Sequence, residues 1–171
     1  MTGRFSSSWI AKMGMLTAAV IVIQFVGFAL PLPLPAAMFL VGTAFSVLLL
    51  CAIDTVSFAG ALLLVILMPI TALLHQAMTH PILLLPAMTA NLVYVLAYTV
   101  LKRRPLWMTA VLVPAARVAG AYAGSTLLLR LFDFDEQIFA GLRSAYVLIQ
   151  FLTGAVGVCI WYDIRRRLPT G

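Results

Sequence analysis

The stretch PILLLPAMTANLVYVLAYTVLKRR, residues 81–104, decides how the chain is interpreted. Its apolar part is about 20 residues long, the length that an α-helix needs to cross the hydrocarbon core of a bilayer. The basic triplet Lys102-Arg103-Arg104 follows directly and marks this end as cytoplasmic, because Lys and Arg concentrate on that side of membrane proteins. Asn91 lies at the middle, where an amide requires partners inside a helix bundle or a cavity. The rest of the chain is expected to supply those partners.

The composition of the whole chain indicates an integral membrane protein. Hydrophobic residues make up 64% of the 171 positions, charged residues make up 9%, and the mean hydropathy is +1.11. A soluble domain of this length does not need so much apolar surface. The formal net charge is +6, but the basic residues sit in short clusters between apolar segments. Membrane topology explains such clusters, so no nucleic acid is expected as a partner.

Six apolar segments predict an all-α bundle of six transmembrane helices in a single domain, residues 1–171. Their expected ranges are 9–30, 37–53, 58–74, 82–101, 107–129 and 138–161. The first segment is too long for the apolar region of a signal peptide, so it is predicted to be a span. The sequence PLPLPA that follows it is expected to form an extended loop, because prolines prevent a regular helix. Pro69 is expected to kink the third span.

The distribution of Lys and Arg predicts the orientation of these spans. If the N-terminus is cytoplasmic, most of the basic residues fall on the cytoplasmic side: Arg4, Lys12, Lys102, Arg103, Arg104, Arg165, Arg166 and Arg167. The other side holds Arg130 and Arg143 together with three acidic residues. Both termini are therefore expected in the cytoplasm.

Three polar residues fall near the middle of three different spans, namely Asn91, Arg117 and Gln150. An Arg at a helix centre costs about 2.5–3.5 kcal/mol on insertion scales, and no Asp or Glu lies at matching depth. Two roles remain open for Arg117. It contacts an anionic or strongly hydrogen-bonding ligand, or it ties helices together through Asn91, Gln150 or backbone carbonyls. If it contacts ligand, Arg117→Ala is expected to weaken binding by about tenfold or more in a protein that still folds.

Other polar side chains are candidates for the same cavity. Tyr94 follows Asn91 by three positions and shares its helix face. Tyr146 precedes Gln150 by four positions, and Gln24 lies in the second half of the first span. Each of these residues is expected either to line a cavity or to pack within the bundle.

The segment before the fourth span contains His75, Gln76 and His80. No Cys or carboxylate lies nearby, so this is a poor metal site. Interfacial solvation or ligand gating is expected instead, and no metal site is predicted. Cys51 and Cys159 lie inside apolar runs and are interpreted as small core-facing or lipid-facing residues.

Small residues recur four positions apart in three spans. The pairs and rows are Gly14 with Ala18, then Ala116, Gly120 and Gly124, and finally Thr153 with Gly157. Such spacing lets helices approach closely. It serves internal packing or docking to another subunit, and spacing alone does not separate the two.

Catalytic and nucleotide-binding signatures are absent from the sequence. It contains no GxxxxGK[ST], HExxH or GxSxG motif and no paired carboxylates within the spans. ATP binding through a P-loop and hydrolytic chemistry are therefore not expected, and the chain is not predicted to be an enzyme.

Four segments, in chain order, resemble the substrate-binding S component of an energy-coupling factor (ECF) transporter of the vitamin-uptake type. They are the proline-rich loop at 31–35 followed by AAMFLVGTAF, then LLPAMTANLVYVLAYTVLKRR, AARVAGAYAGSTLLL and YVLIQFLTGAVGVCIWYDIRRRL. The last segment matches a Gln-x-x-Thr-Gly pattern through Gln150, Thr153 and Gly154. The third differs from many family members, which carry Lys where this chain has Arg117.

The resemblance implies a six-helix fold in a prokaryotic cytoplasmic membrane. It implies a site for a vitamin or related metabolite near the outer surface, lined mainly by the last three spans and gated by outer loops. It also implies partners, namely a transmembrane coupling (T) subunit and two cytoplasmic ATPase subunits, which use ATP while this chain binds no cofactor. Docking would involve the first three helices and the sixth, with Gly14, Ala18 and Gly60 as contact points.

Two alternatives belong to other functional classes. The first is a scaffold membrane protein of the cell-shape (rod-shape) machinery, in which Asn91 and Arg117 are internal ties. The presence of a bound small molecule would separate this role from transport. The second is a proton-coupled carrier, which the lack of acidic residues at mid-depth disfavours.

Overall fold

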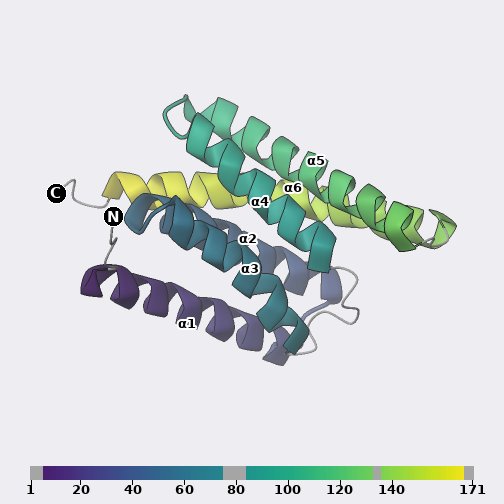
Figure 1. Ribbon diagram of the computed structural model, residues 1–171, viewed down its shortest axis with the longest axis horizontal. Helices are drawn as coiled ribbons and strands as arrows, with labels where there is room; N and C mark the ends of the chain where they lie inside the picture. The colour runs from purple at the N-terminus through teal and green to yellow at the C-terminus, as the bar shows by residue number, and fades with distance from the viewer. Residues whose placement is uncertain (1–5, 75–83, 133–135, 168–171) are drawn as a thin grey trace.

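The computed structural model describes residues 6–74, 84–132 and 136–167, with side chains at all of these positions except 28, 34 and 132–146. The described residues form six α-helices that lie alongside one another in a bundle (Figure 1). They are α1 (Ser7–Ala29), α2 (Leu34–Thr55), α3 (Phe58–Leu74), α4 (Leu84–Leu101), α5 (Leu106–Phe132) and α6 (Glu136–Arg167). The prediction of an all-helical protein with six helices is confirmed.

The loop between the first two helices is shorter than the sequence predicted. We expected residues 31–36 to be extended, but α2 already begins at Leu34, with Pro33 as its N-cap and Pro35 in its first turn. A proline is tolerated there because the first N–H groups of a helix have no intrahelical acceptor. The prolines therefore start this helix as well as ending the loop.

Five of the helices, α1, α2, α4, α5 and α6, are long and apolar enough to cross a membrane. The 17 residues of α3 are also apolar, but they cover only about 25 Å at 1.5 Å per residue. Large apolar side chains are exposed on the outside of the bundle, which suits contact with lipid better than contact with water. The chain is a multi-pass membrane protein by these criteria.

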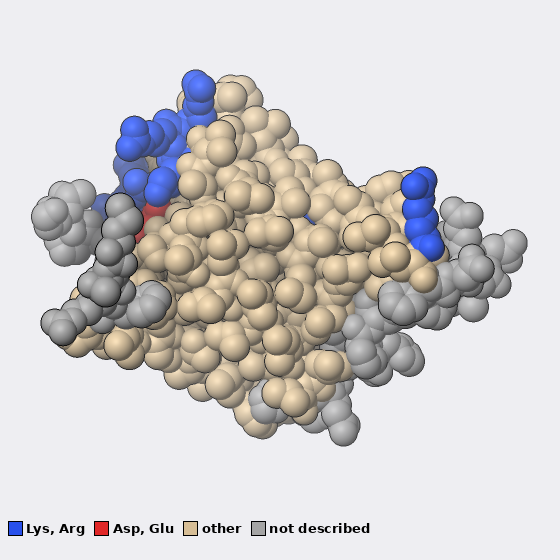
Figure 2. All heavy atoms as spheres, in the orientation of Figure 1, with Lys and Arg blue, Asp and Glu red and all other residues tan. Residues whose placement is uncertain are grey.

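Charge is concentrated at the ends of the bundle. Figure 2 shows Lys and Arg gathered mostly at one end, while other residues form almost all of the wide face between the ends. The start of α1 and the end of α6 lie at this basic end (Figure 1). Such segregation is what the distribution of Lys and Arg in the sequence predicts for spans that alternate in direction.

A polar cluster, which we call the Asp54 cluster, ties three helices together at the basic end. It consists of Asp54 on α2, Tyr98 on α4, Lys102 just after α4, and Trp161 and Arg165 on α6. The Tyr98 hydroxyl and the Trp161 indole N–H donate to Asp54 Oδ2 at 2.9 and 3.0 Å. Lys102 Nζ lies 3.2 Å from Asp54 Oδ1, and Arg165 lies 3.5 Å from Oδ2. One carboxylate therefore joins the ends of α2, α4 and α6.

Glycines let α4 and α5 approach closely. A Cβ added at Gly120 would meet the Thr89 carbonyl oxygen and the Val93 side chain at 2.9 Å. At Gly124 it would overlap the Thr89 side chain and lie 2.9 Å from Pro86 Cα. These two members of the small-residue row thus serve internal packing.

The helices α2 and α6 are packed in the same way. A Cβ at Gly157 would overlap Ser46, and one at Gly42 would lie 3.0 Å from the Thr153 methyl group. Because each side contributes a glycine opposite a small hydroxyl residue, α2 and α6 can pack with their backbones close together.

The three expected docking residues lie in different environments. Gly14 has open space where a Cβ would be, and Ala18 is exposed on the same helix. Gly60 is buried instead, and a Cβ there would lie 2.9 Å from both Met13 and Val56. Gly60 therefore belongs to the internal contact between α1 and α3 and does not reach the surface that Gly14 and Ala18 share.

Candidate functional site

A cavity of about 290 Å³ lies among all six helices. Its lining residues are Gln24, Gly27, Ala37, Met38, Val41, Gly42, Phe45, Met68, Pro69, Ala72, Ala87, Asn91, Arg117, Ile149, Gln150 and Thr153. On α2 they belong to the first half of the helix, whereas Asp54 is in its last turn. On α4 they precede Lys102 by more than two turns. The cavity is therefore in the half of the bundle away from the basic end.

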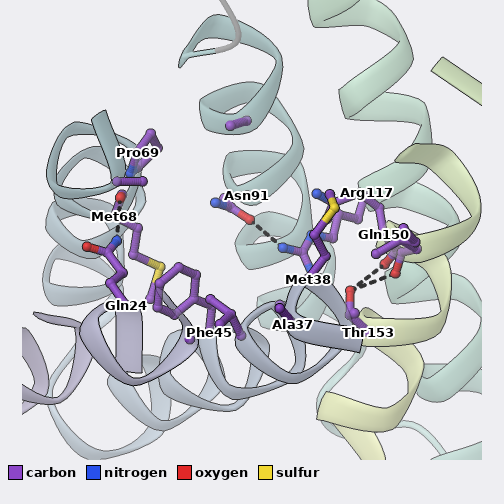
Figure 3. A pocket seen from close by; sticks show the side chains of 16 residues that line it. Gln24, Ala37, Met38, Phe45, Met68, Pro69, Asn91, Arg117, Gln150 and Thr153 are labelled. Carbon is purple, nitrogen blue, oxygen red and sulfur yellow. Dashed lines mark hydrogen bonds between the residues drawn. The ribbon is translucent and has the colours of Figure 1, made fainter. Parts of the chain in front are cut away.

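One side of the cavity is polar. Asn91 from α4, Arg117 from α5, and Gln150 and Thr153 from α6 lie together on this side (Figure 3). The sequence predicted the first three of these as residues at mid-depth. The structure brings them to the same cavity, although they come from three separate helices.

Arg117 is held by two side chains and a ring. Its Nη1 donates to Ser46 Oγ at 2.7 Å, and its Nη2 donates to Asn91 Oδ1 at 2.8 Å. Its guanidinium carbon lies 5.0 Å from the centre of the Tyr94 ring, within the range of a cation–π interaction. Only 3% of Arg117 is exposed. The bond to Asn91 is one of the structural ties that the sequence left open, yet Arg117 also lines the cavity.

Ser46 is a site residue that the sequence did not single out. Its hydroxyl donates to the Gly42 carbonyl at 2.8 Å and accepts from Arg117. A serine bonded to the carbonyl four residues back is common in helices, so its position gave no signal. The only cue was its four-residue spacing from Gly42, which is shared by many unrelated pairs.

Tyr94 packs against Arg117 on the polar side of the cavity. It is fully buried, and its hydroxyl donates to the Gly154 carbonyl at 3.0 Å. A Cβ at Gly154 would lie 3.3 Å from the same ring, so glycine makes room for the tyrosine. Tyr94 is not among the described residues that line the cavity. It positions Arg117 and joins α4 to α6.

The opposite side of the cavity is mainly apolar and contains Gln24. In Figure 3, Gln24 lies beside Met68 and Pro69, with Phe45 below them. Gln24 Nε2 donates to the Met68 carbonyl at 2.9 Å and so ties α1 to α3. Gln24 is only 4% exposed, and its Oε1 has no hydrogen-bond partner among the described residues.

Gln150 carries a second buried oxygen of this kind. Its Oε1 makes no hydrogen bond within the part of the chain that the structure describes. Burying an amide oxygen without a partner costs about 1–3 kcal/mol. Gln24 and Gln150 both line the cavity, but these two oxygen atoms are buried and are not exposed to it.

The remaining candidates fall outside the described residues. His75 and Gln76 belong to the gap between α3 and α4, and the side chain of Tyr146 is not described. The predictions for these three residues stay predictions. No group of three or more His, Cys, Asp or Glu residues that could hold a metal occurs in the described part of the chain.

The lining of the cavity differs from what the resemblance implied. Most of the described lining residues come from α1, α2 and α3, rather than from the last three helices. The reason is that α2 and α3 supply small and apolar residues, such as Gly42 and Ala72, which leave the space open. The last three helices contribute most of the polar groups instead.

No family model, curated protein or solved structure matches the chain. The functional argument therefore depends on the geometry of the cavity and on the sequence pattern.

Proposed function

We propose that the chain is the substrate-binding S component of an ECF-type importer, which captures a vitamin or related small metabolite and delivers it through a coupling subunit. The observation that carries this proposal is the cavity among the six helices. Its volume of about 290 Å³ is at the lower end of the range for small-molecule sites, about 300–1,000 Å³. Its mixture of an apolar lining and a few convergent polar groups is also typical of such sites.

The position of the cavity supports capture from outside the cell. Basic residues face the cytoplasm in most membrane proteins, and the cavity lies in the half of the bundle away from them. A molecule would then bind on the outer side, where an importer must collect it. His75 and Gln76, which lie outside the described residues, are proposed as part of a gate, as the resemblance implies.

The partners in this proposal are a T subunit and two cytoplasmic ATPase subunits. The chain has no P-loop of its own, so ATP hydrolysis would occur on those partners. Binding energy and ATP energy would be linked through a change in the population of outward and inward states. The exposed small residues Gly14 and Ala18 on α1 are the proposed docking contacts, since a neighbouring helix could approach them closely.

A scaffold protein of the cell-shape machinery is the second candidate. The hydrogen bonds from Arg117 to Ser46 and Asn91 favour it, because a pure structural tie would look the same. The cavity with its mixed polar and apolar lining favours the transport role, because a scaffold does not need a space of this size among its helices.

The first experiment is to purify the protein in a mild detergent, denature it, and identify the released molecules by mass spectrometry. A stoichiometric vitamin-like compound is expected. Ala87→Phe should abolish its retention, because Ala87 lines the cavity. Ala115→Phe is the matched control, because Ala115 is exposed on α5.

Co-purification of a T subunit and ATPases with the unmodified protein would then test the transport assignment. A folded protein that carries no molecule and captures no such subunits would refute it and support the scaffold role. Equal retention in the two Phe variants would place any bound molecule elsewhere.

A further inference from the structure

The two sides of the cavity differ in chemistry, and this difference indicates what kind of ligand fits. The polar side carries Asn91, Arg117, Gln150 and Thr153. The facing side carries apolar groups and one amide, Gln24 (Figure 3). A ligand that matches both sides must have a polar head and an apolar body.

The polar side favours a head with a single negative charge. Among the described lining residues, Arg117 is the one cation, and none is Asp or Glu. The bond from Arg117 to Asn91 Oδ1 fixes the Asn91 amide, so its NH₂ group turns away from Arg117. Figure 3 shows this nitrogen directed across the cavity toward the Pro69 side. A carboxylate placed there accepts from the Asn91 amide within the field of Arg117, and such charge-assisted bonds are stronger than neutral ones.

The apolar side favours a hydrocarbon body. Phe45, Met68 and Pro69 lie together on this side, and the neighbouring small residues Gly27 and Ala72 leave the space that the body would fill. Burial of apolar ligand surface against these groups supplies non-directional affinity.

Gln24 adds no polar requirement on this side. Its Nε2 is committed to the Met68 carbonyl, which fixes which atom of the amide is the oxygen. The Oε1 atom is buried, and Figure 3 shows it on the side of the amide away from Phe45. A ligand in the cavity therefore meets mainly apolar groups on this side.

From these observations we infer that the cavity binds a small monocarboxylate with an apolar body. This inference deepens the proposed function and rests on it. A phosphate monoester, with about two negative charges, fits less well, because the described lining offers one cation.

The test compares three probes on the purified protein, dialysed free of any retained molecule, by isothermal calorimetry. The probes are hexanoate, hexanamide and butyl phosphate. Hexanoate is expected to bind about tenfold more tightly than hexanamide. Butyl phosphate is expected to bind more weakly than hexanoate.

One variant identifies the group responsible. Asn91→Asp retains an oxygen for Arg117 but replaces the NH₂ donor with a negative charge, so it should weaken hexanoate by about tenfold or more and hexanamide by less. Arg130→Gln, at an exposed arginine near the far end of α5, is the control and should change none of the three affinities.

Equal binding of hexanoate and hexanamide, tighter binding of butyl phosphate, or no binding of any probe would overturn the inference. The proposed function fails separately, through the absence of a retained molecule and of partner subunits. A retained neutral compound, for example, would contradict the monocarboxylate and leave the importer assignment standing.

Discussion

Removing the carboxylate of the Asp54 cluster should destabilise the bundle far more than removing another carboxylate from the same end. The Asp54 side chain is 12% exposed and receives hydrogen bonds from Tyr98, Lys102 and Trp161. Two of these donors, Tyr98 and Trp161, are buried, and each bond to a charged acceptor contributes about 1.5–3 kcal/mol. Trp161 still reaches the Tyr98 hydroxyl at 3.0 Å after the change, which offsets part of the loss. The partly exposed ion pairs add about 0–1 kcal/mol each. Asp54→Ala should therefore lower the free energy of unfolding by about 2–4 kcal/mol.

The matched control is Asp163→Ala. Asp163 pairs with Arg167 at 3.0 Å one turn along the same helix, but these side chains are 63% and 79% exposed. Its loss should cost about 0–0.5 kcal/mol. Unfolding by SDS in mixed micelles, followed by tryptophan fluorescence, measures both variants. Equal costs for Asp54→Ala and Asp163→Ala would refute the claim that this cluster holds α2, α4 and α6 together. Asp54→Asn should fall between wild type and Asp54→Ala, because it keeps an acceptor and loses the charge.

Three further predictions concern the contacts around the cavity. Gly157→Leu should lower the unfolding free energy by at least about 1–3 kcal/mol, because any side chain there overlaps Ser46. Its control, Gly14→Leu, should leave stability unchanged in the same assay. Gly14→Leu should also reduce capture of the T subunit. Tyr94→Phe should cost about 1 kcal/mol through loss of its bond to the Gly154 carbonyl, measured by the same titration. Arg117→Ala should lower both ligand affinity and stability, the latter by about 1–3 kcal/mol, whereas unchanged stability would show that its bonds to Ser46 and Asn91 contribute nothing.

The helices and the mid-depth residues could be predicted from the sequence for simple physical reasons. Apolar length fixes the spans. Most helix ends lie within three residues of the predicted ends, but α6 continues six residues beyond its predicted end, through Arg165–Arg167. Asn91, Arg117 and Gln150 stood out because a polar group at bilayer depth needs a partner. All three line the cavity, and Gln24, chosen on the same grounds, lines it too.

Asn91 was one of the partners that the sequence offered for Arg117, but Ser46 could not be predicted, because the rotation of each helix about its axis leaves little trace in the sequence. A lipid-facing helix is apolar on all sides, so its hydropathy does not show which face points inward. The rotation is set by contacts such as Gly157 against Ser46 and Gly42 against Thr153. These contacts also decide that Ser46, rather than another hydroxyl of α2, meets Arg117.

The strengths of the ties around the cavity decide which side can open most easily. On the polar side, Arg117 joins α5 to α2 and α4 through two bonds from a charged donor, each worth about 1.5–3 kcal/mol. Toward the basic end, the Asp54 cluster holds α2 and α4 together with α6. On the facing side, the bond between Gln24 and the Met68 carbonyl joins α1 to α3, and such a neutral bond is worth about 0.5–1.5 kcal/mol. Separation of α1 from α3 beside the cavity therefore costs less than any movement that breaks the Arg117 bonds. A ligand would then enter at this weaker side, while the proposed carboxylate site beside Asn91 stays preformed.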